Sequence, residues 1–152
     1  MKTAVFPGSF DPFTTGHADI VGRGLGIFGK IIIAIGVNSG KTPFQDLDER
    51  LRTIRALYAG DSRVEVTTYQ GLTADLAAKC HADAILRGVR SLKDYEYERD
   101  MADINRQLNG IETVLLFCRS ELAAVSSSTV RELNRFGADI TPFLPTPPAE
   151  RD

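Results

Sequence analysis

Apolar residues occur along this chain as short continuous runs separated by helical stripes. The runs lie in residues 3–6, 31–37, 64–68, 84–86 and 113–117. The run at residues 31–37 is uninterrupted, as is typical of a strand that is buried between helices on both faces of a parallel sheet. The repeated strand–helix order predicts an α/β fold, namely a single-domain, Rossmann-like, doubly wound sheet with five mainly parallel strands.

Helical periodicity fills the intervals between these runs. The first stripe begins near Gly16 and places Ile20, Val21, Ile27 and Phe28 on one helix face. Further stripes lie in residues 47–57, 72–77, 95–108 and 127–136. Helices are therefore expected on both faces of the sheet.

A segment rich in glycine and proline joins the first run to the first helix. It reads FPGSFDPFTTGH at residues 6–17, and the strand is expected to break at Pro7. His17 would lie in the first helical turn, where free backbone N–H groups and the helix dipole stabilise an anion. An imidazole in that place can donate to a phosphoryl oxygen. The alternative is a helix capped by Thr14 or Thr15 beside an incidental surface histidine.

Three more polar motifs follow other expected strands. Lys41 follows the second run, the RGVR motif of residues 87–90 follows the fourth, and the serines of residues 126–128 follow the fifth. Ligands of open α/β sheets bind beyond the carboxyl ends of the strands. Four loops are therefore expected to converge on one site.

The RGVR motif offers two guanidinium groups in a loop that directly follows a strand. Such planar forks suit phosphate oxygens. The alternative is that Arg87 and Arg90 are solvated and pair with Asp83, Asp94 or Glu96. The position at a strand's carboxyl end favours the ligand-binding interpretation.

The serines and Lys41 also have two interpretations each. The hydroxyls and free N–H groups near Ser126 would hold a diphosphate, whereas one serine would suffice as an ordinary helix cap. Lys41 would bring an ammonium to a second phosphate group, or it is a surface lysine. The GKT sequence at residues 40–42 does not fit a P-loop, whose first glycine would fall on Ile35.

Length and charge limit the classes of function that the protein can have. The 152 residues, 43% of them hydrophobic, suit one domain, expected at residues 1–141. Residues 142–152 form a proline-rich tail that cannot sustain a helix and is expected to be partly disordered. A net charge of −2 argues against partners such as nucleic acid or an anionic membrane.

The two cysteines and the N-terminus predict a cytoplasmic protein. Cys80 and Cys118 lie far apart and are expected to be reduced core thiols. Neither a signal-peptide core nor a run of transmembrane length is visible. The spacing around His81 does not form a zinc site, so no metal ligand is assigned. Residues 95–98 read as a solvated helical face with its aromatic side chains packed below.

Residues 7–17 resemble the opening of the (H/T)xGH nucleotidylyltransferase superfamily, and within it the chain resembles the phosphopantetheine adenylyltransferase family. The family pattern continues through Lys41 and residues 87–90, 95–98 and 125–131, so the resemblance covers nearly the whole chain. The chain departs from the pattern at Ser9, where threonine is common, and at residues 122–124, which replace a more aromatic segment. These departures concern binding more than chemistry.

The resemblance implies three sets of site residues. The catalytic set is His17, Thr14, Lys41 and Arg90. The set for 4′-phosphopantetheine is Ser9, Lys41, Leu72, Thr73 and Arg87. The set for ATP is Ser9, Phe10, His17, Gly88, Val89, Arg90, Glu98, Leu122, Ala123, Ala124, Val125, Ser126, Ser127 and Ser128.

The resemblance also implies the reaction. An adenylyl group would pass from ATP to 4′-phosphopantetheine by direct in-line attack, giving dephospho-coenzyme A and pyrophosphate, with Mg²⁺ bound through the ATP phosphates. Family membership further implies a homohexamer and feedback inhibition by coenzyme A. Two alternatives stay open: a sister transferase that uses nicotinamide mononucleotide or glycerol phosphate as acceptor, and a nucleotide-binding regulatory module without turnover.

Overall fold

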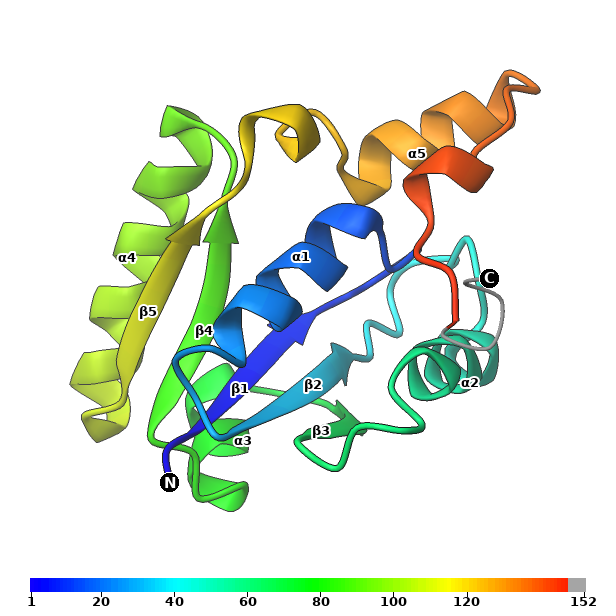
Figure 1. The fold of residues 1–152 in the computed structure, drawn as a ribbon. Coiled ribbons are helices and arrows are strands. Elements are labelled where there is room, and N and C mark those ends of the chain that lie inside the picture. The colour runs from blue at the N-terminus through cyan, green and yellow to red at the C-terminus, as the bar shows by residue number, and fades with distance from the viewer. Residues whose placement is uncertain (148–152) are drawn as a thin grey trace.

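Five parallel strands form the centre of the computed structural model, which describes residues 1–147 (Figure 1). Their order across the sheet is β3-β2-β1-β4-β5, and every neighbouring pair is parallel. This confirms the predicted fold class. The strands are β1 (Thr3–Gly8), β2 (Lys30–Gly36), β3 (Val64–Tyr69), β4 (Ala84–Val89) and β5 (Glu112–Phe117).

Helices cover both faces of this sheet. Helices α1 and α2 lie on one face and α3 and α4 on the other, while α5 lies beyond the carboxyl ends of the strands (Figure 1). Among residues 1–147, no helix is long and apolar enough to span a membrane. The helices are α1 (Thr15–Gly24), α2 (Leu47–Leu57), α3 (Thr73–Lys79), α4 (Leu92–Asn109) and α5 (Ser127–Arg135), with 3₁₀ turns at Ser120–Leu122 and Thr141–Phe143.

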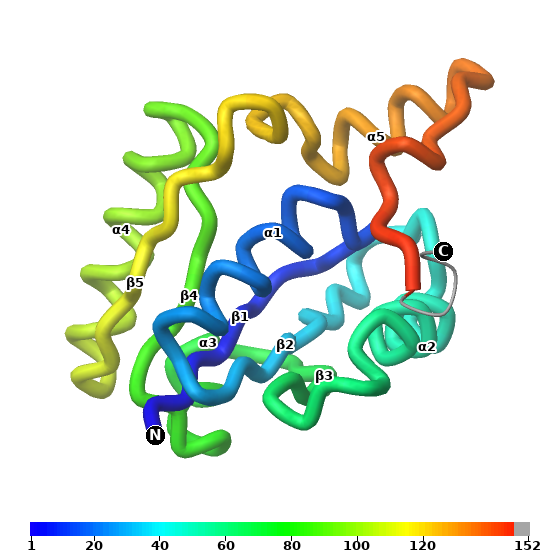
Figure 2. Tube along the Cα trace, in the orientation of Figure 1, coloured from blue at the N-terminus to red at the C-terminus, as the bar shows by residue number. Residues whose placement is uncertain are grey.

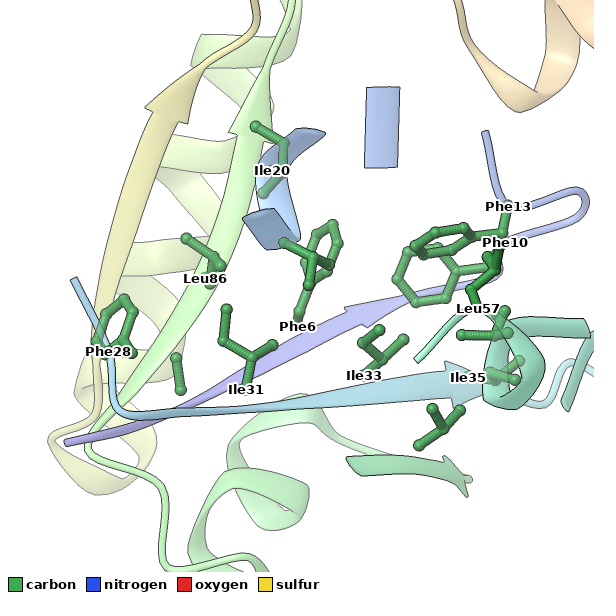
Figure 3. Close-up of a cluster of buried hydrophobic side chains, with 14 of the residues drawn as sticks. Phe6, Phe10, Phe13, Ile20, Phe28, Ile31, Ile33, Ile35, Leu57 and Leu86 are labelled. Carbon is green, nitrogen blue, oxygen red and sulfur yellow. The ribbon is translucent and has the colours of Figure 1, made fainter. Parts of the chain in front are cut away.

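The core divides along the two faces of the sheet because successive strand residues point in opposite directions. Phe6, Ile31 and Ile33 pack toward α1 and α2, where Figure 3 shows them with Phe10 and Phe13. A smaller cluster on the opposite face packs β1 and β2 against α3. Because side chains alternate between the two faces, helices pack against the sheet from both sides.

The two central strands separate toward their carboxyl ends. Between β1 and β4 only Ala4 and Val5 are paired with Ala84 and Ile85, whereas β1 pairs with β2 through Gly8. The strand order reverses direction at this same place, so it is the topological switch point of the sheet. The chain trace in Figure 2 shows β1 and β4 diverging there. A ligand site is expected at this opening.

Several predicted boundaries are wrong at this end of the sheet. β1 continues through Pro7 to Gly8 instead of breaking at the proline. β4 includes residues 87–89, so these residues belong to the strand and not to a loop after it. Each strand continues because its neighbour still pairs with it, β2 with β1 and β5 with β4. The RGVR motif is therefore held more rigidly than a loop would hold it.

Other differences concern surface residues. Helix α1 ends at Gly24, which leaves Ile27 outside the helix and exposed. Tyr95 and Tyr97 are also exposed, whereas Glu98 is buried, so the predicted orientation of that helical face is reversed. The cysteines are free but only half-buried. The predicted disorder of the tail concerns, in part, residues 148–152, which lie outside the described residues.

Candidate active site

The first turn of α1 fixes the imidazole of His17 through its own backbone. Thr14 is the N-cap, and its side chain accepts from the His17 N–H at 3.4 Å. In return, the Thr14 N–H donates to Nδ1 of His17 at 2.9 Å. This reciprocal capping box makes Thr14 the cap, one of the two threonines that the alternative interpretation offered. Because Nδ1 accepts a hydrogen bond, the neutral ring carries its proton on Nε2.

The surroundings of His17 keep this ring neutral. Burial, and then the positive charges of Arg87 and Arg90, lower the pKa of His17 from 6.5 to about 3. The Phe10 ring meets the imidazole edge-on at a centroid distance of 5.0 Å, and the Phe13 ring lies at 5.3 Å. At neutral pH the side chain is therefore a hydrogen-bond donor through Nε2 with a fixed ring.

Phe10 reaches His17 only because the preceding chain is constrained. Its φ of 48° lies in the left-handed region, which a bulky residue rarely adopts. A Cβ at Gly8 would lie 2.9 Å from the Phe10 ring, so this close approach requires glycine. From α2, the buried Arg50 donates through Nη1 to the Ser9 carbonyl at 2.7 Å. Backbone strain at Phe10 is thus stabilised by contacts on both sides.

A cleft of about 360 Å³ opens between α1, the end of β4 and the start of α5, and it is called the α5 cleft here. It brings together most of the residues predicted for ATP. Those that line it are Ser9, Phe10, His17, Gly88, Arg90, Glu98, Val125, Ser126, Ser127 and Ser128, together with Asp94, Tyr97, Cys118 and Arg131.

The serine end of α5 is tied to the segment before α1. Ser126 caps α5, and its Oγ accepts from the Thr129 N–H at 3.1 Å. Ser127 Oγ donates to the Pro12 carbonyl at 2.8 Å. One serine is therefore a cap, as the alternative interpretation expected, while Ser128 is exposed at the cleft. The free N–H groups of this helix end suit an anion.

A second cleft of about 340 Å³ lies between the strand ends and α4, and it is called the α4 cleft here. Three of the residues predicted for 4′-phosphopantetheine, Ser9, Thr73 and Arg87, line it. Asn105 is buried in its wall, and the buried Oγ1 of Thr113 has no hydrogen-bond partner within the described residues. This cleft therefore offers polar groups to an elongated ligand.

Arg87 joins the two clefts. Its guanidinium donates through Nε and Nη2 to the carboxylate of Glu98, with a shortest distance of 2.6 Å, and through Nη1 to the Pro7 carbonyl. The partner is thus Glu98 and none of the three acids considered from the sequence. Arg90 pairs with Asp94 at 3.3 Å, one of those three. Both guanidiniums remain at the cleft surface.

Some predicted residues lie outside both linings. Lys41 is exposed in the loop after β2, and Leu72 is 54% exposed beside the lining residues Gly71 and Thr73. Val89 is buried in β4. Residues 122–124 are in neither lining, although a Cβ at Gly16 would be 4.0 Å from the Leu122 carbonyl oxygen. Thr14 is fully buried, and its N–H binds His17.

The sequence analysis missed several cleft residues. Met101, Ala102 and Asn105 lie in the α4 cleft with Glu98. Their spacing of three and four residues could have placed them on the helix face of Glu98. The sequence around Thr113 has no spacing pattern that could have placed this residue in the cleft. Within residues 1–147, no group of three or more His, Cys, Asp or Glu side chains is arranged to hold a metal ion.

Comparisons with known proteins agree with this geometry. A family model described as cytidylyltransferase-like matches residues 5–133. The phosphopantetheine adenylyltransferase of Phocaeicola vulgatus is 49% identical over 145 residues, which cover 95% of this chain and 96% of that protein. The enzyme of the same name from Porphyromonas gingivalis is 51% identical over 142 residues, with 93% of each chain covered.

Solved structures show the same fold at low identity. A bifunctional NMN adenylyltransferase/ADP ribose pyrophosphatase from Francisella tularensis has a TM-score of 0.61 at 17% identity, covering 94% of this chain and 44% of that one. The near-complete matches to the curated relatives carry the assignment. With its switch-point clefts and its fixed histidine, the chain belongs to the phosphopantetheine adenylyltransferase family and is a nucleotidyltransferase.

Proposed function

We propose that this protein transfers the adenylyl group of ATP to 4′-phosphopantetheine, giving dephospho-coenzyme A and pyrophosphate. A phosphate oxygen of 4′-phosphopantetheine attacks the α-phosphorus of ATP in line. The bond from that phosphorus to the bridging oxygen breaks, and its electron pair leaves with pyrophosphate. Because the attacking phosphate is already an anion, positioning and charge stabilisation suffice, and no covalent enzyme intermediate is needed.

The main support is the neutral His17 ring, which lines the α5 cleft with Arg90 and the serine end of α5. Its Nε2–H would donate to the α-phosphoryl group as negative charge builds there. Thr14 keeps that proton on Nε2 by binding Nδ1. Arg90 and the serines would hold the remaining ATP phosphates.

The α4 cleft would hold the acceptor. Ser9 and Arg87 line both clefts and would place the acceptor phosphate beside ATP, with Lys41 reaching in from its loop. The pantetheine arm carries two amides, which suit the polar atoms of Asn105 and Thr113 in the cleft wall. Mg²⁺ would be bound through the ATP phosphates, where it neutralises their charge.

Pyrophosphate release with ATP, Mg²⁺ and 4′-phosphopantetheine tests the proposal. Release should require the acceptor, and His17→Ala should lower kcat about 10²–10³-fold with little change in KM. Parallel reactions offer nicotinamide mononucleotide or glycerol 3-phosphate. Release with only one of these would indicate a sister transferase, and ATP binding without release would indicate a regulatory module.

Assembly, location and regulation belong to the same proposal. A homohexamer needs apolar surface, and α4 exposes Tyr97, Met101, Ile104 and Leu108 at spacings of three and four residues, which place them on one side of the helix. Sedimentation of Ile104→Glu beside the native chain tests whether this stripe is buried on assembly.

The two free cysteines fit a cytoplasmic location. Feedback by coenzyme A would act at the same clefts, since it shares the pantetheine and adenosine moieties.

A further inference from the structure

The loop that carries Lys41 ends on the carboxylate of Asp11. The Phe44 N–H donates to Oδ2 of Asp11 at 2.8 Å, and the Gln45 N–H donates to Oδ1 at 2.8 Å. Two successive backbone amides thus bind the two oxygens of one carboxylate. Hydrogen bonds to an ionised acceptor are stronger than those between neutral groups. The end of the loop is therefore held by a side chain that belongs to the segment before α1.

Asp11 is also bound from the opposite direction. Arg131 of α5 donates through Nη1 to the Asp11 carbonyl at 2.8 Å, and Ser127 of α5 binds the next carbonyl, that of Pro12. Helix α5 and the Lys41 loop thus meet at residues 11–12. The side chain of Asp11 holds the loop, and its main chain holds the helix.

Lys41 lies between this anchor and the end of β2. It is exposed and lies three residues before Phe44. On its other side, the Gly40 N–H donates to the Asn38 side chain at 3.0 Å, and the Lys41 N–H to the Asn38 carbonyl at 3.4 Å. Those contacts shape a turn at the α4 cleft, whose wall includes Asn38. The contacts with Asp11 tie the other end of the loop to the segment before α1.

We propose that Asp11 is a positioning residue that fixes the Lys41 loop relative to the serine end of α5. The ammonium that meets the acceptor phosphate is thereby held at a set distance from the helix that binds the ATP phosphates. This inference rests on the proposed role of Lys41 in acceptor binding. Asp11 itself is in the lining of neither cleft and acts through the loop.

Steady-state kinetics of four proteins test the kinetic part: the native chain, Asp11→Ala, Lys41→Ala and the double variant. Asp11→Ala should raise KM for 4′-phosphopantetheine about 5- to 10-fold, no more than Lys41→Ala, because it misplaces the ammonium that Lys41→Ala removes. KM for ATP should change less than about 3-fold. In the Lys41→Ala background the same substitution should add less than about 2-fold, since coupled residues are not additive. Full additivity would overturn the proposal.

Hydrogen exchange tests the anchor without relying on activity. The amides of Phe44 and Gln45 should exchange at least about 10-fold faster in Asp11→Ala, whereas those of β1 should not change. Unchanged exchange at these two amides would overturn the proposal. Asp11→Asn, which keeps one acceptor oxygen, should give a smaller increase and provides a milder variant should Asp11→Ala fold poorly.

Asp61→Asn is the matched control. Asp61 accepts the Arg63 N–H at 3.0 Å in the turn before β3, away from both clefts. Its kinetics and the exchange of the Lys41 loop should match those of the native chain, and a loop response equal to that of Asp11→Asn would overturn the proposal. Failure of the proposed function looks different, because the native chain would then release no pyrophosphate. If the native chain is active and Lys41→Ala has the same KM for 4′-phosphopantetheine, only the positioning role of Asp11 is overturned.

Discussion

Two segments at neighbouring strand ends are held very differently. The front segment, residues 7–14, is fastened by Arg50 from α2 and by Arg131 and Ser127 from α5, and its Phe10 and Phe13 rings are buried. The Lys41 loop has an exposed chain from residue 38 to residue 44. It is held at the end of β2, where the Val37 N–H donates to the Tyr69 carbonyl, and through Asp11. The front segment makes the contacts that hold His17, whereas the Lys41 loop contributes the single ammonium of Lys41.

This difference matches two different tasks. A donor to a transition state must keep its geometry closely, and rate falls steeply with misplacement. A cation that gathers a substrate phosphate can sit on a less constrained loop, because a flexible ammonium adapts to its partner. Substitutions in and around the front segment, other than at Asp11, should therefore change stability and turnover together, whereas those in the loop and at its Asp11 anchor should change substrate binding.

The largest effect is expected where β4 joins the front segment. Glu98→Gln removes the carboxylate that faces Arg87, whose Nη1 also holds the Pro7 carbonyl. Because Glu98 is buried and Arg87 only partly exposed, the unpaired guanidinium should cost about 3 kcal/mol of unfolding free energy. Urea denaturation measures it. Glu96→Gln, an exposed neighbour, is the control, and equal losses for the two variants would show that the junction is not rigid.

The second effect is a pH dependence that belongs to His17. Its pKa is about 3 in the folded protein against an ordinary value of 6.5, so the unfolded chain binds one proton more between these pH values. The contribution of His17 to the free energy of unfolding is fully present above pH 6.5 and is lost as the pH falls toward 3. Between pH 7 and pH 4.5 this loss should be about 2–3 kcal/mol.

His17→Gln isolates that contribution, because all other titrating groups are shared. Urea denaturation of both proteins at pH 7, 5.5 and 4.5 should show a shallower decline for the variant. Parallel declines would mean that the imidazole is not held neutral, and the contrast between the two segments would weaken. Turnover of the native chain should show no step near pH 6.5 from His17.

The strands were predictable because their apolar runs are local signals. All five expected runs lie in strands, with limits wrong by a few residues at most. The largest error concerned residues 87–89, where arginine and glycine interrupt the apolar pattern but pairing with β5 continues the strand. A cross-strand partner far away in the sequence overrides a local breaker signal.

The site was predictable only where it has a local motif. Residues 14–17 and 126–128 carry helix-start signals, so a cap was expected at Thr14 or Thr15 and at one of the serines, and the structure has Thr14 and Ser126 in these places. Arg50 lies in a helical stretch and reads as a surface residue, yet it is buried beneath Ser9. Thr113 likewise reaches the α4 cleft only because α4 crosses beside β5, a long-range packing that periodicity does not reveal.

The third effect tests Arg50 as a support of the front segment. Arg50→Met keeps the buried stem but removes the donor to the Ser9 carbonyl. Loss of one hydrogen bond to a partly buried carbonyl should cost about 1–2 kcal/mol, and kcat should fall about 10-fold as Phe10 and His17 shift. Thermal unfolding and turnover measure these. Arg52→Met, at an exposed position on the same helix, should have the stability and the kcat of the native chain. A kcat of Arg50→Met equal to that of the native chain would contradict the support role.

The smallest effect on stability is expected in the Lys41 loop, and it sharpens the contrast most. Lys41 is exposed, so Lys41→Ala should change the unfolding free energy by less than about 0.5 kcal/mol. KM for 4′-phosphopantetheine should nevertheless rise about 10-fold, because a charge-assisted contact to phosphate is lost, while kcat changes less. Lys79→Ala, another exposed lysine at the end of α3, controls for net charge. A fall in kcat without a rise in KM would place Lys41 with His17 at the transition state, and would mean that a loosely held loop can carry a catalytic group.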